Sequence, residues 1–169
     1  MDICRFMEND KTFYGNILTH DEDTVVLKKI ISDVYTVDET KIFLSEEILK
    51  IKKSDLLLPV NPSKIICLAI NFKGITNFSS DNPEPVVFLK ASNSLCLDRS
   101  KISLPFNNVK SWGESELAFV VKKKTKNIDQ LTASKNILGY LLANDISSEN
   151  VYGRDHHLAR SKAADNYCP

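Results

Sequence analysis

Apolar and polar positions alternate in short blocks over the first third of the chain, which is the pattern of half-buried strands. ICRFM and TFYGNIL flank the polar turn ENDK, so these blocks are expected to form a hairpin. TVVLKKII predicts a further strand. FLSEEILKI fits either a short helix or an extended arm, because its periodicity does not decide between them. Residues 1–54 are therefore expected to form a small β-rich lobe.

Longer apolar runs follow from Asp55 onwards. In DLLLPVNPSK, Pro59 and Pro62 favour an extended crossing into KIICLAIN, whose apolar continuity is typical of a buried strand. The polar segment FKGITNFSSDNPEP is long enough to be a flexible loop or lid rather than a tight turn. VVFLKA predicts the next strand.

The remaining blocks add more strand than helix. ELAFVVKK and YLLANDIS predict strands. NIDQLTASKNILGY predicts a short helix, with Asn127 or Asp129 as its cap and Gly139 near its C-terminal end. The expected class is α+β, mainly β, with residues 1–54 as an N-terminal lobe and residues 55–169 as the main domain.

Composition narrows the function classes. The 169-residue chain has 43% apolar and 26% charged residues, and its 22 basic residues balance its 22 acidic ones. There is thus no electrostatic case for binding nucleic acid or an anionic membrane, and KKKTK at 122–126 is interpreted as a solvated strand end. No stretch approaches the ~20 apolar residues of a membrane span, and the N-terminus has no signal-peptide pattern. A cytoplasmic protein is expected.

The stretch SWGESELAFVV carries the first candidate chemistry. Glu114 and Glu116 are two residues apart at the head of an apolar strand, so they share one face, roughly 6–7 Å apart. At ~4 Å and an effective dielectric near 20, two carboxylates repel by about 4 kcal/mol. Solvent, a basic partner or a cation has to compensate this charge.

Five blocks taken in order resemble the fumarylacetoacetate hydrolase family. They are LLLPVNPSKIICLAINF, PEPVVFLKASNSL, GESELAFVV, GYLLANDIS and ARSKAADNYCP. The family includes acylpyruvate hydrolases, oxaloacetate decarboxylases and isomerases of 2-hydroxyhepta-2,4-diene-1,7-dioate. The resemblance covers residues 55–169 and implies a mixed β-sheet roll with few short helices. The first 54 residues resemble only the variable N-terminal lobe of the family.

The resemblance implies a metal site. Family members hold Mg²⁺, Mn²⁺ or Ca²⁺ with an E-x-E pair and a later aspartate, which correspond here to Glu114, Glu116 and Asp145. Hard divalent cations prefer such oxygen ligands. A cation of this kind chelates a small 2-oxo acid and stabilises the enolate formed when a C–C bond breaks or a proton moves.

Further site residues are implied by the same blocks. Lys162 matches a substrate-side lysine of the family, which would hold a carboxylate or neutralise an oxyanion. Lys90, in VVFLKA, is expected to line the same cleft. Asn71 and Phe72 are expected on the substrate side as well. Arg154 lies outside these blocks and is a hypothesis for a replacement charge near Glu149, with His156 and His157 as the alternatives. The family resemblance also implies a homodimer.

The chain departs from the family pattern at three places. Where hydrolytic members carry a water-activating histidine and glutamate, NFKGITNF has Ile75 and Phe78, neither of which accepts a proton. After Asp145, an arginine and a glutamine of the family are replaced by Glu149 and Tyr152. The sequence also stops at NYCP, before the C-terminal part that the family pattern includes.

Three hypotheses follow from these residues. The first is a metal-dependent hydrolase, decarboxylase or isomerase of a small 2-oxo or β-diketo acid. The missing dyad affects hydrolysis more than decarboxylation or isomerisation, because these two reactions need an electron-sink metal more than an activated water. The second is a catalytically degenerate relative that keeps the fold and the metal and acts as a binding or oligomeric protein. The third is a β-rich interaction domain with a misleading resemblance.

Overall fold

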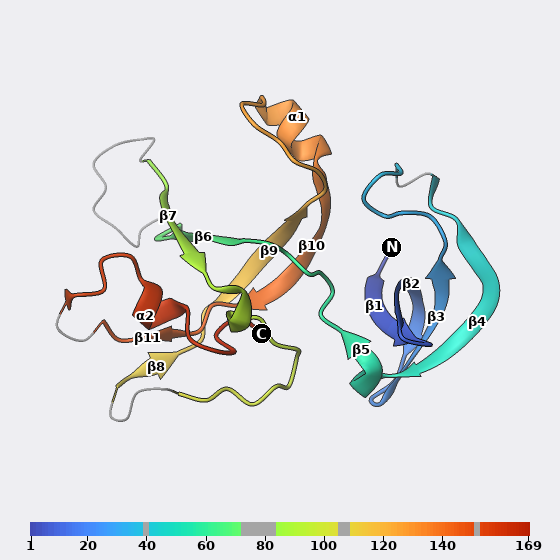
Figure 1. The fold of residues 1–169 in the computed structure, drawn as a ribbon, viewed down its shortest axis with the longest axis horizontal. Helices are drawn as coiled ribbons and strands as arrows, with labels where there is room; N and C mark the ends of the chain where they lie inside the picture. The colour runs from blue at the N-terminus through green and yellow to red at the C-terminus, as the bar shows by residue number, and fades with distance from the viewer. Residues whose placement is uncertain (39–40, 72–83, 105–108, 151–152) are drawn as a thin grey trace. The chain divides into compact units, whose positions relative to one another are not determined.

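The computed structural model describes residues 1–38, 41–71, 84–104, 109–150 and 153–169 (Figure 1). The chain divides into two compact units. Residues 1–61 and 117–141 form one, and residues 62–116 and 142–169 form the other. The boundary predicted between residues 54 and 55 stays a prediction. No helix in the described part of the chain has the length and hydropathy of a membrane-spanning segment.

The N-terminal unit is built on one five-stranded sheet with the order β4-β3-β2-β1-β5. Its neighbouring strands are antiparallel, and β1 to β4 run from blue to cyan in Figure 1. A short 3-10 turn, η2 (Lys53–Asp55), precedes the last strand. The strands are β1 (Ile3–Glu8), β2 (Lys11–His20), β3 (Thr24–Ile30), β4 (Leu44–Lys52) and β5 (Leu56–Leu57).

The predicted N-terminal hairpin is confirmed. β1 and β2 pair from Ile3 opposite Asn16 to Glu8 opposite Lys11. Asn9 and Asp10 connect them with φ of 48° and 59°. Two consecutive residues with positive φ form the tight turn that matches strand twist, and asparagine and aspartate tolerate this conformation well.

The core of this sheet is aliphatic and aromatic. Phe6 and Leu27 are fully buried and Cys4 is buried beside them, and side chains from β2, β4 and β5 pack around them. Leu49 of β4 lies opposite Leu27, which explains why the ambiguous segment FLSEEILKI is a strand. Gly15 is in close contact with this core, because a Cβ there would lie 2.9 Å from Cδ1 of Leu27.

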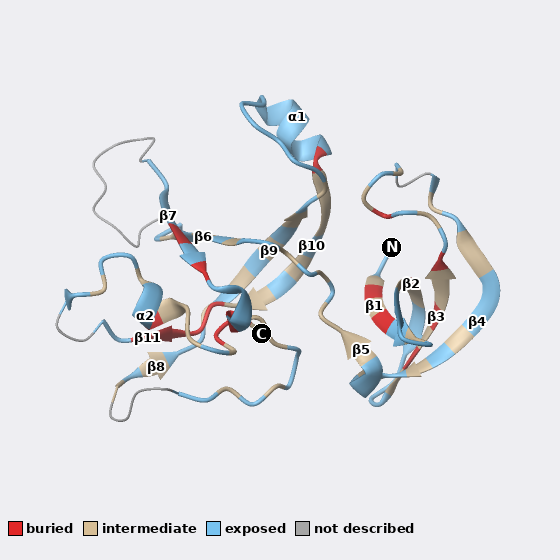
Figure 2. Ribbon diagram, viewed as in Figure 1, coloured by how far each residue is buried: buried red, intermediate tan, exposed pale blue. Residues whose placement is uncertain are grey.

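The second unit consists of short strands and turns. Strands β6 (Ile65–Ala69) and β7 (Val86–Lys90) form one antiparallel ladder, and β8 (Ser111–Trp112) and β11 (Ser147–Ser148) form another. Figure 2 shows buried residues on β7 and β11 of this unit, and Tyr167 and Cys168 of its C-terminal segment are buried as well. Two short helical turns, η3 (Ser92–Ser94) and α2 (Ala159–Lys162), complete it.

The β6–β7 ladder has one apolar face open to solvent. Ile66 lies opposite Leu89 and Leu68 opposite Val87, and these four side chains are 46–64% exposed. Phe88, on the alternate face, is buried. The run KIICLAIN predicted a buried strand. That prediction is correct for the strand and wrong for its burial.

Strands β9 (Ser115–Val121) and β10 (Ile137–Asn144) pair with each other and contribute residues to both units. Between them lies α1 (Gln130–Lys135), and the Asp129 side chain caps it by accepting from the N–H of Thr132. The helix is shorter than predicted, and Gly139 lies within β10 instead of at the helix end. The structure confirms an α+β class that is mainly β. The predicted loop at residues 72–85 lies largely outside the described residues.

Candidate active site

A backbone hydrogen bond brings two of the predicted acidic residues together. The N–H of Asp145, just after β10, donates to the carbonyl of Glu114, just before β9, at 2.8 Å. Gly113 precedes Glu114 and makes close packing possible, because a Cβ there would lie 2.7 Å from Oδ1 of Asn144. The backbone just before β9 and the backbone just after β10 are thus held next to each other at Glu114 and Asp145.

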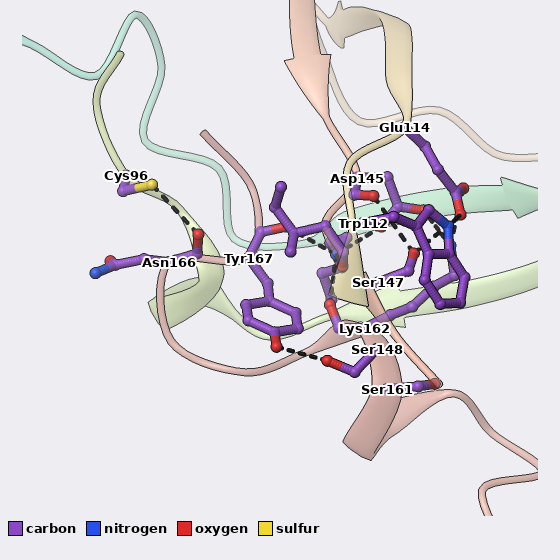
Figure 3. Close-up of polar contacts among 12 residues, drawn as sticks. Cys96, Trp112, Glu114, Asp145, Ser147, Ser148, Ser161, Lys162, Asn166 and Tyr167 are labelled. Atoms are coloured by element: carbon purple, nitrogen blue, oxygen red, sulfur yellow. Dashed lines mark hydrogen bonds and ion pairs between the residues drawn. The ribbon is translucent and has the colours of Figure 1, made fainter. Parts of the chain in front are cut away.

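Lys162 lies between the two carboxylates. Its Nζ is 2.6 Å from Oδ2 of Asp145 and 3.1 Å from Oε2 of Glu114 (Figure 3). Burial lowers the pKa of Lys162, but the hydrogen bonds and negative charges of Asp145 and Glu114 outweigh burial and raise this pKa above its ordinary value. The side chain is therefore a half-buried ammonium at neutral pH.

The position of Lys162 depends on the turn that carries α2. Oδ2 of Asp155 accepts from the backbone N–H of Ser161 at 2.6 Å and from its hydroxyl at 2.7 Å. Burial raises the pKa of Asp155, and the bonds from Ser161, together with the backbone N–H groups of Arg160 and Ala159, lower it below its ordinary value. Asp155 thus acts as an ionised anchor for the short helix that ends at Lys162.

Glu114 is the most extensively hydrogen-bonded carboxylate of the site. Its Oε1 accepts from the indole N–H of Trp112 at 2.7 Å and from the hydroxyl of Ser147 at 3.1 Å, while Oε2 faces Lys162. Burial raises the pKa of Glu114, and the bonds from Trp112, Lys162 and Ser147 together lower it below its usual value. Glu114 is therefore held ionised and in a single orientation.

Glu116 lies two residues further on, in β9. Burial raises its pKa first, and the negative charges of Asp145 and Glu114 raise it further, with Lys162 opposing them. Glu116 thus lies within the electrostatic field of the same cluster. After burial and the charge of Asp145, the repulsion from Glu114 that the E-x-E spacing predicts contributes to this raised pKa.

The side chain of Lys90, at the end of β7, is fully buried. Its Nζ lies 2.7 Å from Oδ1 of Asp145. Its hydrogen bonds run instead to backbone carbonyls, those of Ile146 at 3.2 Å, Tyr167 at 3.0 Å and Lys162. Asp145 is therefore placed between two lysines, one on each carboxylate oxygen.

The donor chemistry fits a divalent cation. Glu114, Glu116 and Asp145 offer only oxygen ligands, which Mg²⁺, Mn²⁺ and Ca²⁺ accept. Oδ1 of Asp145 is buried and receives no hydrogen bond from the described part of the chain, although the ammonium of Lys90 lies 2.7 Å from it. These three carboxylates also outnumber the two ammonium groups beside them. Among the described residues no three side chains of ligand type converge on one point, so the ligand set stays a prediction.

The other predicted site residues are either exposed or lie outside the described residues. Asn71 is exposed just beyond β6, and Arg154 is exposed in the segment before α2. Phe72, Ile75, Phe78 and Tyr152 lie outside the described residues. Glu149 is exposed after β11, and its N–H donates to the carbonyl of Lys110. The substrate-side roles of Asn71, Phe72 and Arg154 stay predictions.

Sequence reasoning missed two partners of the cluster, Trp112 and Ser147. Trp112 is the single tryptophan of the chain and lies two residues before Glu114, a spacing that puts both on one side of an extended segment. Ser147 faces Trp112 across the β8–β11 ladder. The i, i+2 spacing was a usable signal for Trp112, whereas Ser147 required the pairing of two distant strands.

A chain of three hydrogen-bonded hydroxyl groups links the C-terminal segment to strands β8 and β11. The hydroxyl of fully buried Tyr167 lies 2.6 Å from Oγ of Ser148, which lies 2.8 Å from Oγ of Ser111. Ser111 and Ser148 are cross-strand partners. The contacts tie the C-terminal segment to the β8–β11 ladder that carries Trp112 and Ser147.

The fold and site define a class: a mainly β domain in which lysines and carboxylates from distant loops meet in one half-buried cluster. A sequence model described as fumarylacetoacetate (FAA) hydrolase C-terminal matches residues 64–169. The chain belongs to the fumarylacetoacetate hydrolase family. This confirms the resemblance carried by the five sequence blocks.

Curated relatives and a solved structure give the same grouping. The chain is 31% identical over 137 residues to oxaloacetate tautomerase fahd2, mitochondrial, of Xenopus laevis, which covers 74% of this chain and 41% of the relative. It is 31% identical over 119 residues to oxaloacetate tautomerase YcgM of Escherichia coli, covering 67% and 54%. A 5-carboxymethyl-2-hydroxymuconate delta-isomerase from Mycobacterium smegmatis matches 100% of this chain and 64% of its own, with a TM-score of 0.78 and 25% identity.

The chain spans roughly half the length of the curated relatives that it matches. Those relatives include enzymes named for small acids. Their names support the broad expectation of an enzyme that processes small acids, and they leave reaction and cofactor to be argued from this chain.

Proposed function

We propose that this chain carries the active site of a divalent-metal-dependent enzyme that converts a small 2-oxo or β-diketo acid through an enolate. Tautomerisation or isomerisation is the reaction that its residues favour. The observation that carries the proposal is the ammonium of Lys162 held between Glu114 and Asp145. It places a fixed positive charge beside the predicted cation ligands.

Each residue has a part in this proposal. Glu114, Glu116 and Asp145 would hold the cation, Mg²⁺ or alternatively Mn²⁺ or Ca²⁺. When bound, the cation supplies positive charge that stabilises an enolate. Two of the three N–H groups of Lys162 point to carboxylates, and the third is assigned to an oxygen of the substrate.

Proton transfer is favoured over hydrolysis because of what the sequence lacks. Ile75 and Phe78 stand where hydrolytic relatives have a water-activating pair, and neither side chain takes up a proton. Moving a proton between carbon and oxygen needs charge stabilisation more than an activated water. The curated relatives named oxaloacetate tautomerase point in the same direction.

A turnover assay tests the proposal. The protein is incubated with Mg²⁺ or Mn²⁺ and with oxaloacetate, an acylpyruvate or a hydroxymuconate-type diene, and the loss of the enol is followed by ultraviolet absorbance. Metal-dependent turnover is expected with at least one acid, and Glu116→Ala should abolish it. Glu84→Ala, an exposed glutamate outside the cluster, is the matched control and should behave as wild type.

A second candidate is a catalytically degenerate relative that keeps the fold and the metal. The replacement of two substrate-facing residues by Glu149 and Tyr152, together with Ile75 and Phe78, favours it. It predicts metal binding without turnover of any of the three acids, so the same assay separates the two candidates.

A cytoplasmic location and a homodimer, both expected from the sequence, belong to the proposal as well.

A further inference from the structure

Lys90 is a buried charge that the proposed reaction does not use. The sequence suggested a substrate-lining role for it. In the structure its side chain has no exposed surface, and its ammonium faces the backbone. An ammonium has three N–H donors and no acceptor. All three donors have carbonyl partners, so no proton remains for a ligand.

The three carbonyls come from segments far apart in the sequence. Ile146 O belongs to the turn after β10, Lys162 O to the last residue of α2, and Tyr167 O to the C-terminal segment. The sequence separations from Lys90 are 56, 72 and 77 residues. One side chain on β7 thus joins the backbone segments that carry Asp145 and Lys162.

The charge of Lys90 also has a partner. Oδ1 of Asp145 lies 2.7 Å away, and Oδ2 of the same residue faces Lys162. A buried ammonium is costly unless it is paired and hydrogen-bonded. Three carbonyls and one carboxylate meet both requirements, which explains how a fully buried lysine is tolerated here.

We infer that Lys90 is a positioning residue: it fixes Asp145 by charge and the main chain of Ile146, Lys162 and Tyr167 by hydrogen bonds, and it does not bind substrate. Its catalytic consequence rests on the proposed function, whereas its structural consequence does not. Arginine is a poor replacement, because the donors of its planar guanidinium are spread over three nitrogens. The three carbonyls here point to a single nitrogen.

The experiment compares Lys90→Met with wild type and with Lys64→Met, an exposed lysine of the same unit. The catalytic readout is the separation of kcat from KM for the acid that wild type turns over. A displaced cluster should lower kcat about 100-fold and change KM by less than ~3-fold. A KM that rises while kcat is retained would identify Lys90 as a substrate ligand and overturn the inference.

The second readout needs no turnover. Trp112 is the only tryptophan and is hydrogen-bonded to Glu114, which contacts Lys162. Lys90→Met should shift the emission maximum of Trp112 and increase its quenching by acrylamide, and Lys64→Met should do neither. Unchanged emission and quenching in Lys90→Met would overturn the inference. Absence of turnover in wild type would count against the proposed function alone.

A third variant covers a failure of Lys90→Met to fold. Lys90→Arg keeps the charge, and far-UV circular dichroism shows whether it folds. It should show a loss of kcat and a change in Trp112 quenching in the same direction as Lys90→Met, but smaller. Wild-type values in a folded Lys90→Arg would show that the three-carbonyl geometry is unnecessary, which contradicts the inference.

Discussion

The indole N–H of Trp112 donates a 2.7 Å hydrogen bond to Oε1 of Glu114, so the single tryptophan of the chain reports directly on the acidic cluster. Because Mn²⁺ is paramagnetic, it quenches indole emission at short range. If Glu114, Glu116 and Asp145 bind a divalent cation, Mn²⁺ titration should quench Trp112 in a saturable manner.

Glu116→Ala should weaken that quenching at least tenfold in apparent affinity, because it removes one of three charged oxygen ligands. The matched control Glu84→Ala should titrate as wild type. Equal quenching in Glu116→Ala and wild type would show that the carboxylate assignment is wrong.

Lys162→Met should impair both stability and turnover. It removes the ammonium that pairs with Glu114 and with Oδ2 of Asp145, whereas Oδ1 of Asp145 keeps Lys90. Breaking a buried pair costs several kcal/mol. Because Glu114 is about a third exposed, we expect no more than about 3 kcal/mol here. Loss of the Lys162 charge, which is proposed to stabilise the substrate oxygen, should lower kcat by about 10²–10³-fold.

Urea unfolding followed by Trp112 fluorescence, together with steady-state kinetics, measures both effects. Lys135→Met, at the exposed end of α1, is the control and should change neither. A Lys162→Met protein with wild-type kcat would remove Lys162 from the site.

Ser148→Ala should destabilise the protein by about 1–3 kcal/mol, because it leaves the buried hydroxyl of Tyr167 without its partner. In the double variant with Tyr167→Phe both partners are gone, so its cost should be smaller than the sum of the two single costs. Free energies of unfolding from urea titrations complete the cycle. Strict additivity would show that the 2.6 Å contact contributes nothing.

Tyr14 should ionise well above the ordinary range of a tyrosine. Burial and the hydrogen bond with Tyr35 raise the pKa of Tyr14 to about 12. Because the folded-state pKa lies above the ordinary value of 10, the contribution of protonated Tyr14 to the free energy of unfolding is complete below pH 10. It is lost as pH rises toward 12. Phenolate absorbance at 295 nm should show a late step that Tyr14→Phe removes, and a step persisting in that variant would refute the assignment.

Local pattern predicted much of the fold. The polar turn at Asn9 and Asp10 identified the first hairpin, and one of the two predicted caps, Asp129, begins α1. The segment 44–52 stayed ambiguous because its strand form depends on pairing with β3, which lies outside any local window. The helix end was misjudged because Ile137 begins a strand directly after the cap residue Asn136.

The site was predicted unevenly for a related reason. Motif blocks pointed to Glu114, Asp145 and Lys162, and the structure brings these three together. Lys90 was found by the same blocks, yet its partners are backbone carbonyls. Every residue has a carbonyl, so the sequence carries no signal for such contacts, and they emerge only when the chain is folded.

The open face of the β6–β7 ladder has a practical consequence for anyone who purifies this polypeptide. Ile66, Leu68, Val87 and Leu89 present a continuous aliphatic stripe, and covering each of them is worth up to about 1.5–3 kcal/mol. Sulfate salts strengthen that tendency. Preparations should therefore stay dispersed in mild non-ionic detergent and precipitate early in ammonium sulfate, and a charged residue at position 68 should delay that precipitation.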